Sequence, residues 1–308
     1  MLDNSRAARA LCTCVALVFL AASLHAQTID DGQMVRPREL LTGNIYTYES
    51  WDDYWEGPLK RTNDNIGRIT TRTNAWWANY GVSEQLNIIG QVPYVWTHAS
   101  QGYLHDIQGV QDLTLAAKYR VLEATPGDST VRAFAVLSGG VPLSNYNPEL
   151  LPLSIGTGSS RISARGTLNV ETGPGWFANG SAAYTWRSKV QLDRPYYFTD
   201  DTFVMSDQAD MPNAFEYIAS AGLMRPRLMA AGFFSQQRTL GGGDIRRQDM
   251  PFVSNRMNFS KVGGMAMVPV VAGLEVQATV AYTLNGRNVG QATTFTGGLL
   301  YRFNRFRP

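Results

Sequence analysis

Histidine and cysteine, two of the residue types that catalysis uses most, number three and two in this 308-residue sequence, and none stands in a known catalytic pattern. A serine hydrolase requires a serine, a histidine and an orienting polar side chain that the fold brings together. Ser100 lies near His98 and His105, but all three belong to one expected loop. The stretch Ile218-Ala-Ser-Ala-Gly222 lacks the first glycine of a nucleophile elbow. The sequence therefore predicts a protein that is not an enzyme.

Metal and nucleotide sites have equally little support. His98 and His105 are seven residues apart in that loop, whereas metal ligands usually stand closer together on a rigid element. The acidic stretch 200–210 offers oxygen ligands for calcium, but without a regular ligand spacing. Gly241-Gly-Gly243 is not followed by the Lys-Ser/Thr pair of a phosphate-binding loop. We therefore expect no cofactor and no metal.

Residues 1–26 have the features of a cleaved secretory signal peptide. Two arginines precede an apolar run over 10–23, and the small residue Ala26 precedes the expected cleavage site. An uncleaved N-terminal anchor is the alternative, although the apolar run is short for a transmembrane helix. Cys12 and Cys14 both lie in this segment, so the mature chain would hold no cysteine. That excludes a disulfide scaffold, a thiolate zinc site and a cysteine nucleophile.

The composition narrows the class of protein further. Charged residues make up 17% of the chain and hydrophobic residues 44%, and the mean hydropathy is −0.18. A helical membrane protein with several spans needs repeated apolar stretches of about 20 residues, which are missing here. Aromatic residues at 11% argue against a disordered chain. The formal charge of +2 is too small to indicate a nucleic-acid partner.

The elements that must position the polar residues are β-strands. Over 161–171, Ile162 and Leu168 belong to an apolar face, and Arg161 and Arg165 to the opposite polar face. The same period-two alternation recurs along the chain, which is typical of strands, and no sustained helical period is present. It predicts about twelve strands, at 43–55, 66–80, 85–97, 109–123, 130–142, 160–172, 175–188, 213–225, 227–239, 254–268, 273–285 and 290–304.

Short and long connections alternate between these strands. The gaps at 81–84 and 173–175 are short, whereas those at 143–159 and 189–212 are long. Transmembrane β-barrels have short periplasmic turns, longer outer loops and an even strand count. We therefore predict an all-β fold, a transmembrane antiparallel up-and-down β-barrel in the outer membrane of a Gram-negative cell, with membrane lipids on its outside. A secreted soluble β-sandwich is the alternative.

Strand parity also predicts which polar side chains face the lumen of such a barrel. Mixed positive and negative charges on that face argue against strong ion selectivity. The candidates are Lys118, Arg120, Arg132, Arg161, Arg165, Glu171, Glu275 and Gln277.

One predicted hairpin resembles a known family. Residues 80–94 run Tyr-Gly, a short turn and an alternating strand through Pro-Tyr, and 109–123 then contain Gly-x-x-Asp and Lys-Tyr-Arg. This pattern is similar to that of the MetA-pathway of phenol degradation family, most strongly over 80–142. The resemblance implies an outer-membrane barrel and a transporter associated with the degradation of aromatic compounds. The residues that carry it are Tyr80, Gly81, Pro93, Tyr94, Asp112, Lys118, Tyr119 and Arg120.

The motif residues have structural and functional interpretations, and both stay open at this point. Gly81 is expected in a tight turn, because glycine tolerates positive φ, and Pro93 is expected at a bulge. The charged residues of the motif share one face and could form a network with Arg132 or contact a solute.

These observations predict a channel for the passive passage of small solutes, with aromatic or hydrophobic compounds among the candidates. Its partners would be the solute, membrane lipids and the barrel-assembly machinery, which reads the end of the chain near Phe306. Residues 27–42 would form a periplasmic segment and 43–308 the barrel. The alternative is a structural or surface-recognition barrel, in which the aromatic loop 189–212 binds a partner or folds into the pore.

Overall fold

The computed structural model describes residues 28–199, 201–246 and 252–303. The predicted signal peptide and the C-terminal residues from 304 onward lie outside this part of the chain. Within it, no helix is long and apolar enough to cross a membrane.

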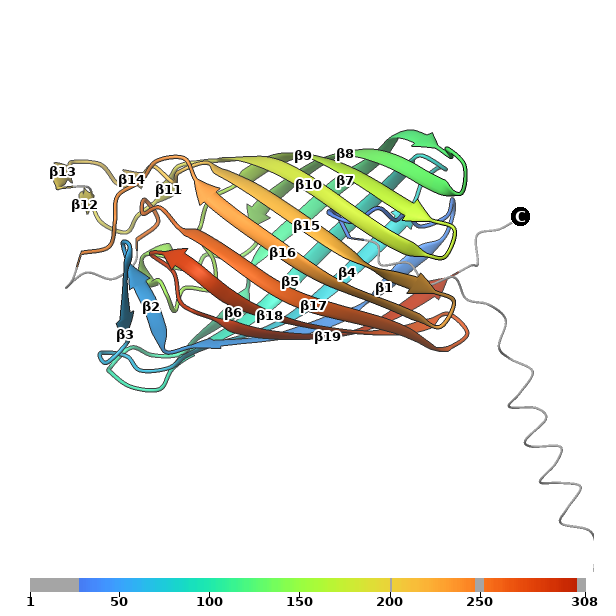
Figure 1. Cartoon of the computed structure of the whole chain (residues 1–308). Coiled ribbons are helices and arrows are strands. Elements are labelled where there is room, and N and C mark those ends of the chain that lie inside the picture. The colour runs from blue at the N-terminus through green and yellow to red at the C-terminus, as the bar shows by residue number, and fades with distance from the viewer. Residues whose placement is uncertain (1–27, 200, 247–251, 304–308) are drawn as a thin grey trace, which may run out of the picture.

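A single antiparallel sheet closes on itself to form a barrel (Figure 1). Neighbours in sequence are neighbours in the wall, and the circle closes where β1 pairs with β19 along its length, from Leu40 opposite Phe303 to Ser50 opposite Thr293. The wall strands are β1 (Leu40–Trp51), β4 (Ile69–Gly81), β5 (Leu86–Ala99), β6 (Ile107–Val110), β7 (Asp112–Ala124), β8 (Ser129–Pro142), β9 (Arg161–Thr172), β10 (Trp176–Arg187), β15 (Ala214–Arg225), β16 (Leu228–Thr239), β17 (Asn258–Val271), β18 (Leu274–Arg287) and β19 (Thr293–Phe303).

The strands β6 and β7 occupy one position in the wall. Both pair with β5, and the register shifts by one residue between them, at Gln111. Counted this way, the wall of the described chain has twelve strands, which confirms the predicted all-β barrel.

Each predicted strand has its counterpart in the wall. One clear difference in bounds is at the first strand, which was expected at 43–55 and runs from Leu40 to Trp51. It stops early because Asp53–Glu56 (β2) pairs with Leu59–Thr62 (β3) to form a small hairpin of its own. Residues 53–55 therefore continue the strand-like alternation but leave the wall.

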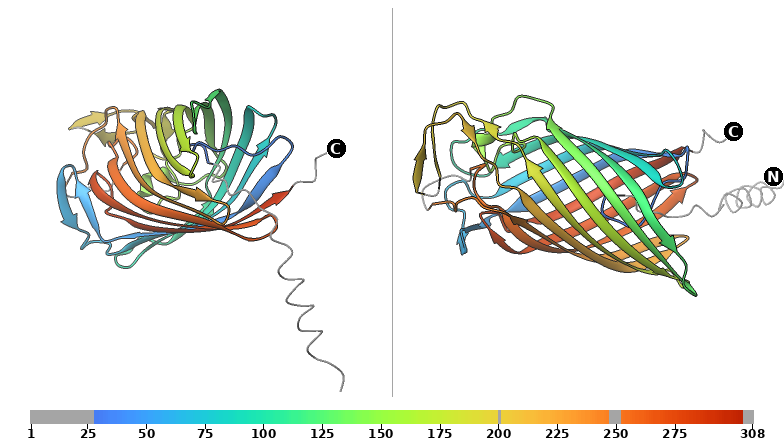
Figure 2. Two further views of the ribbon diagram at one scale, coloured as in Figure 1. Left: turned by 45° about the vertical axis from the view of Figure 1, so that its right-hand side comes forward. Right: turned by 90° about the horizontal axis from the view of Figure 1, so that it is seen from above.

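The two ends of the barrel differ. One end, which we call the turn end, carries the short connections, the start of β1 and the end of β19 (Figure 1). The other, the loop end, carries the long connections. They include the hairpin β2–β3, the short pairs β11 (Val190–Gln191) with β14 (Gln208–Ala209) and β12 (Tyr197–Thr199) with β13 (Thr202–Val204), and a 3-10 helix η1 (Pro148–Leu150). The strands run obliquely between the ends (Figure 2).

Side chains alternate between the outside and the inside of the wall. On β9, Ile162 and Leu168 are exposed on the outside, whereas Arg165 and Asn169 are buried inside. A β-bulge after Arg120 places both Val121 and Leu122 outside. The exterior is thus mainly apolar and the interior largely polar, which is the arrangement that the alternation predicts.

The aromatic loop 189–212 does not enter the barrel. Val190, Tyr197 and Ala209 pack against Phe252 and Val253 of the loop after β16, and together they form a small core at the loop end. The hairpin β12–β13, on which Phe198 and Phe203 are exposed, projects from the loop end (Figure 1).

Asn288 joins three of the loops at the loop end. Its side-chain oxygen accepts hydrogen bonds from the backbone N–H groups of Gly57 (2.8 Å) and Ile245 (3.1 Å). Its side-chain nitrogen donates to Asp244 Oδ1 (2.8 Å), which also accepts from Arg287 Nε (2.8 Å). The hydrogen bond from Arg287 is the main reason that the pKa of Asp244 lies below its usual value of 3.8.

We expect this loop junction to loosen only in strong acid. Because the pKa of Asp244 is lowered in the folded state, its stabilising contribution is complete above pH 3.8 and is lost as the pH falls through the lowered value. Pepsin cleavage of the loop after β16 should therefore rise, relative to cleavage of an unfolded substrate, as the pH falls below 3.8. Asp244→Asn should make cleavage fast already at the higher pH. Equal cleavage of both proteins throughout would contradict the assignment.

Candidate functional site in the barrel interior

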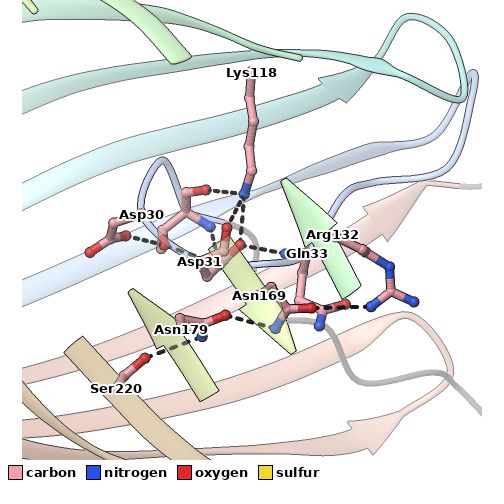
Figure 3. A network of polar contacts seen from close by, with 9 residues as sticks. Asp30, Asp31, Gln33, Lys118, Arg132, Asn169, Asn179 and Ser220 are labelled. Atoms are coloured by element: carbon pink, nitrogen blue, oxygen red, sulfur yellow. Dashed lines mark hydrogen bonds and ion pairs between the residues drawn. The ribbon is translucent and has the colours of Figure 1, made fainter. Parts of the chain in front are cut away.

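A fully buried lysine on β7 holds a segment that lies inside the barrel (Figure 3). Lys118 Nζ donates to the carbonyl oxygens of Thr28 (2.8 Å) and Asp31 (2.9 Å) and to Asp31 Oδ1 (2.7 Å). Burial of an ammonium group costs several kcal/mol unless acceptors replace its water. Three acceptors from one short segment meet that need, so the segment and Lys118 depend on each other.

The segment 28–39 follows the inner wall from the base of β1 and then crosses towards β7 and β9. Val35 packs with Leu41 and Trp77 on the inner face. Gly32 lies so close to the Asn169 side chain that an added Cβ would overlap it. We expected a periplasmic segment over 27–42; in the structure, its described part up to residue 39 lies against inward-facing side chains, and β1 already begins at Leu40.

A row of amides continues from this contact across the wall (Figure 3). Asn169 Nδ2 donates to Asn179 Oδ1 (2.7 Å), and Asn179 Nδ2 donates to Ser220 Oγ (3.1 Å). Arg132 Nη1 lies 3.3 Å from Asn169 Oδ1. Buried amides that satisfy one another in this way fix the rotamers of an otherwise adaptable polar wall.

Two groups of ion pairs line the interior near the turn end. In the first, Glu123 joins Arg120 (2.6 Å) to Arg132 (3.1 Å), and Arg132 also contacts Glu171 (2.8 Å). In the second, on the other side of the barrel, Arg302 contacts Glu275 (3.0 Å) and Glu39 (3.5 Å). The expected single network of Asp112, Lys118 and Arg120 with Arg132 is therefore divided, because Lys118 binds Asp31 and Asp112 binds elsewhere.

Arg165 and Gln277 lie farther along the inner wall. Arg165 forms an ion pair with Glu216 and donates to Ser181 Oγ (2.7 Å). Gln277 lies over Gly298 of the neighbouring strand, where an added Cβ would approach the Gln277 Cγ to 2.7 Å. A glycine here makes room for a long side chain that follows the wall.

At the loop end, the connection 143–160 folds into the mouth of the barrel. Arg161 Nη1 and Tyr146 Oη both donate to Asp112, each at 2.6 Å. Burial, followed by the hydrogen bond to Asp112, raises the pKa of Tyr146. Leu153 packs against Ile69 and against Ala99 on the inner face. The long loop that occupies the mouth is therefore this one, rather than 189–212.

A cavity of about 360 Å³ remains inside the barrel between these elements. Aromatic and thioether side chains form much of its lining, while Thr28, Asp30 and Asp31 of the inner segment close one side. The charged side chains Glu216 and Lys261 also reach it. The apolar lining consists of Phe177, Ile218, Met229, Phe233, Phe259 and Met265.

Of two expected roles of motif residues, one needs correction and one is confirmed. Gly81 is not in a turn with positive φ; it is the last residue of β4. Its missing side chain leaves space for the carbonyl of Arg36, which an added Cβ would overlap. Pro93 lies at a β-bulge, as expected. Its pairing with β4 is regular, but on its other side the register shifts by one residue opposite it, at Gln111, so no ladder donor is needed from the proline nitrogen.

The motif tyrosines face the outside of the barrel. Tyr80 and Tyr119 are exposed, and the Tyr119 hydroxyl donates to Gln85 Oε1 (3.0 Å) at the turn end. Tyr94 lies against Trp96, with 4.6 Å between the ring centroids, nearer the loop end. These tyrosines therefore belong to the outer surface, while Asp112, Lys118 and Arg120 belong to the interior.

His98 and Ser100, which were considered for catalysis, lie at the loop end and are engaged separately. His98 Nδ1 is 2.8 Å from Asp106 Oδ1, whereas the Ser100 hydroxyl accepts a hydrogen bond from the backbone of Arg68 (2.8 Å). In the part of the chain that the structure describes, no three His, Cys, Asp or Glu residues are grouped to bind a metal ion.

The family comparison agrees with this architecture. A family model described as "Putative MetA-pathway of phenol degradation" matches residues 62–250, more than half of the chain. The chain belongs to this family. The match includes the motif hairpin, the buried Lys118 and the loop that enters the barrel mouth, whereas the inner segment 28–39 precedes it. No curated protein matches the sequence.

Solved structures resemble this phenol degradation family member to different degrees. The COG4313 outer membrane channel from Pseudomonas putida F1 superimposes with a TM-score of 0.69 at 15% identity, over 91% of this chain and 100% of that one. The translocator domain of the autotransporter NalP from Neisseria meningitidis (TM-score 0.46, 12% identity, 97% and 98% covered) and the CymD monoaromatic hydrocarbon channel (0.42, 10%, 86% and 88%) are more distant.

Sequence reasoning missed the inner segment and the loop in the mouth. Asp31 and Tyr146 belong to neither a strand nor a motif, so strand parity does not assign them a side. The one usable signal is Lys118 itself, a cation in the middle of a strand; its partners on the neighbouring strands are Asn87 and Val136, neither of them acidic.

Proposed function

We propose that this protein is an outer-membrane channel through which small solutes, aromatic or hydrophobic compounds among them, pass by diffusion. The observation that carries the proposal is the cavity of about 360 Å³ in the middle of a closed barrel whose outside is apolar. Membership of the phenol degradation family and the likeness of the fold to an outer-membrane channel support it.

In this proposal the solute binds transiently in the apolar cavity, which lies between the two polar ends of the barrel. A solute with an aromatic ring would contact Phe233 and Met265, because ring edges and thioether groups pack well against aromatic faces. The inner segment borders the cavity on one side, and the loop 143–160 lies in the mouth at the loop end. The lumen-lining residues we propose are Lys118, Arg120, Arg132, Arg161, Arg165, Glu171, Glu275 and Gln277, whose charges are mostly paired.

Conductance of the purified protein in planar phospholipid bilayers tests the proposal. We expect discrete single-channel steps, and phenol added to the bath should block them. Phe233→Ala should weaken the block about fivefold, since a lost aromatic contact costs about 1 kcal/mol. Phe234→Ala is a matched control, because the adjacent phenylalanine faces outward and does not line the cavity. Absence of conductance steps together with absence of phenol uptake into proteoliposomes would refute the channel.

A further inference from the structure

The outside of the barrel carries an arginine that the channel does not use. On β4, Ala75 and Trp77 are buried inside, whereas Arg72 and Trp76 are exposed outside. Arg72 makes no ion pair in the described residues, although the nearby Arg68 is paired with Asp52 at 2.8 Å. An unpaired cation on a surface that lipid would cover is costly at the bilayer centre and nearly free of cost at the interface.

Its position on the strand places Arg72 at such an interface. Arg72 is nine residues from Gly81, which ends β4 at the turn end. At about 3.3 Å per residue and a tilt of about 40°, it stands roughly 23 Å above that end. The apolar band of a barrel is about 25 Å tall. Arg72 therefore lies at the upper edge of the band, towards the loop end.

The surroundings of Arg72 form a recess of about 650 Å³ in the outer wall. Tyr46 and Trp96 contribute aromatic faces, and Gln108 contributes an amide. His98 and Asp106 also line it, but the carboxylate of Asp106 is engaged by His98 Nδ1 at 2.8 Å. The recess thus combines a free guanidinium group with aromatic side chains suited to the interfacial layer of a membrane.

From these observations we propose that the recess around Arg72 binds the phosphate of a phosphorylated glycolipid in the outer leaflet, as lipopolysaccharide provides. This inference rests on the outer-membrane location proposed above, in which the long loops face outward. The fork of an arginine matches phosphate oxygens in two-point contact. The acyl chains would lie along the apolar wall below the recess, where Trp76 is exposed on the same strand. A glycolipid held there would fix the barrel at one height in the membrane.

Binding of lipid A to the purified, delipidated protein in detergent tests the proposal. Native mass spectrometry should show lipid A retained by the wild type, with about tenfold weaker retention after Arg72→Gln, because a charge-assisted contact is lost. Dephosphorylated lipid A should bind the wild type as weakly as lipid A binds the variant. Arg225→Gln is the matched control, since Arg225 is an exposed arginine at the turn end of β15, and it should retain lipid A as the wild type does.

These experiments test the glycolipid site independently of the proposed channel function. Equal retention by the wild type and Arg72→Gln, or no effect of the phosphate groups, would overturn the glycolipid site. Single-channel steps in bilayers of phospholipid alone test the channel without any glycolipid, and Arg72→Gln should leave them unchanged. A variant that no longer folds is recognised by the loss of its heat-dependent shift on electrophoresis; the dephosphorylated lipid, which needs no variant, then decides.

Discussion

Replacement of Lys118 by methionine should raise the conductance of the barrel several-fold. The methionine keeps most of the volume of the lysine but removes the ammonium group that donates to the Asp31 carboxylate and to two carbonyl oxygens. Breaking a buried ion pair by removing one partner costs about 3–5 kcal/mol. Much of that cost can be relieved if residues 28–34 leave the interior, because the wall strands hold one another by their own ladders.

The measurement is the single-channel conductance of Lys118→Met, compared with that of a variant that lacks residues 28–36. The deletion variant gives the highest conductance expected when the inner segment is absent. Adding Asp31→Asn to Lys118→Met should lower the conductance part of the way back to the wild-type value, since the uncompensated charge of the Asp31 carboxylate is then removed. Lys60→Met is the matched control; its partner Asp53 lies 2.9 Å away, but the pair is exposed in the hairpin β2–β3 and worth about 0–1 kcal/mol. Unchanged conductance in both Lys118→Met and the deletion would show that the inner segment does not restrict the pore.

Replacement of Leu168 by arginine should destabilise the barrel in a bilayer by about 2–4 kcal/mol. Leu168 is exposed on the outer face of β9, four residues from the turn end of that strand, within the height that lipid would cover. An arginine there would have to keep its charge in hydrocarbon or distort the membrane around it. The effect measures directly whether the apolar exterior faces lipid.

Leu240→Arg is the control for this substitution. The two leucines are equally exposed, at 52% and 53%, but Leu240 follows the end of β16 in a loop. Urea titration of folding into lipid vesicles should show a large loss for Leu168→Arg and almost none for Leu240→Arg. A small, equal effect of both would favour a soluble barrel and contradict the membrane location on which the proposals above depend.

The wall of the barrel could be predicted from the sequence because strand alternation is a local property. The place of a residue such as Leu168 or Arg165 in the alternation predicts which side of the wall its side chain faces, and short turns fix which strands are neighbours. Even the register shift at Gln111 is indicated by a local feature of the sequence, because Pro93 lies on the strand opposite it. These features need no knowledge of distant contacts.

The contents of the barrel could not be predicted in the same way. The position of Asp31 depends on Lys118, 87 residues later, and that of Tyr146 depends on Asp112 across the mouth. Neither segment has a period that reveals which face it presents. Gly81 shows the same limit on a smaller scale, because its role is to admit the carbonyl of Arg36 and not to make a turn. Long-range polar contacts of this kind become visible only in the folded structure.

The contacts of the inner segment also determine when in assembly it can take its place. Residues 28–39 precede the whole barrel in the chain, yet Val35 packs in one cluster with Leu41, at the start of β1, and Leu300, on the last strand. The surface that receives the segment is complete only after β19 has joined β1. Residues 28–39 can therefore complete their packing only after the circle has closed. A barrel that closes in the wrong register would misplace Lys118 relative to Leu300, and residues 28–39 would remain undocked and open to proteolysis.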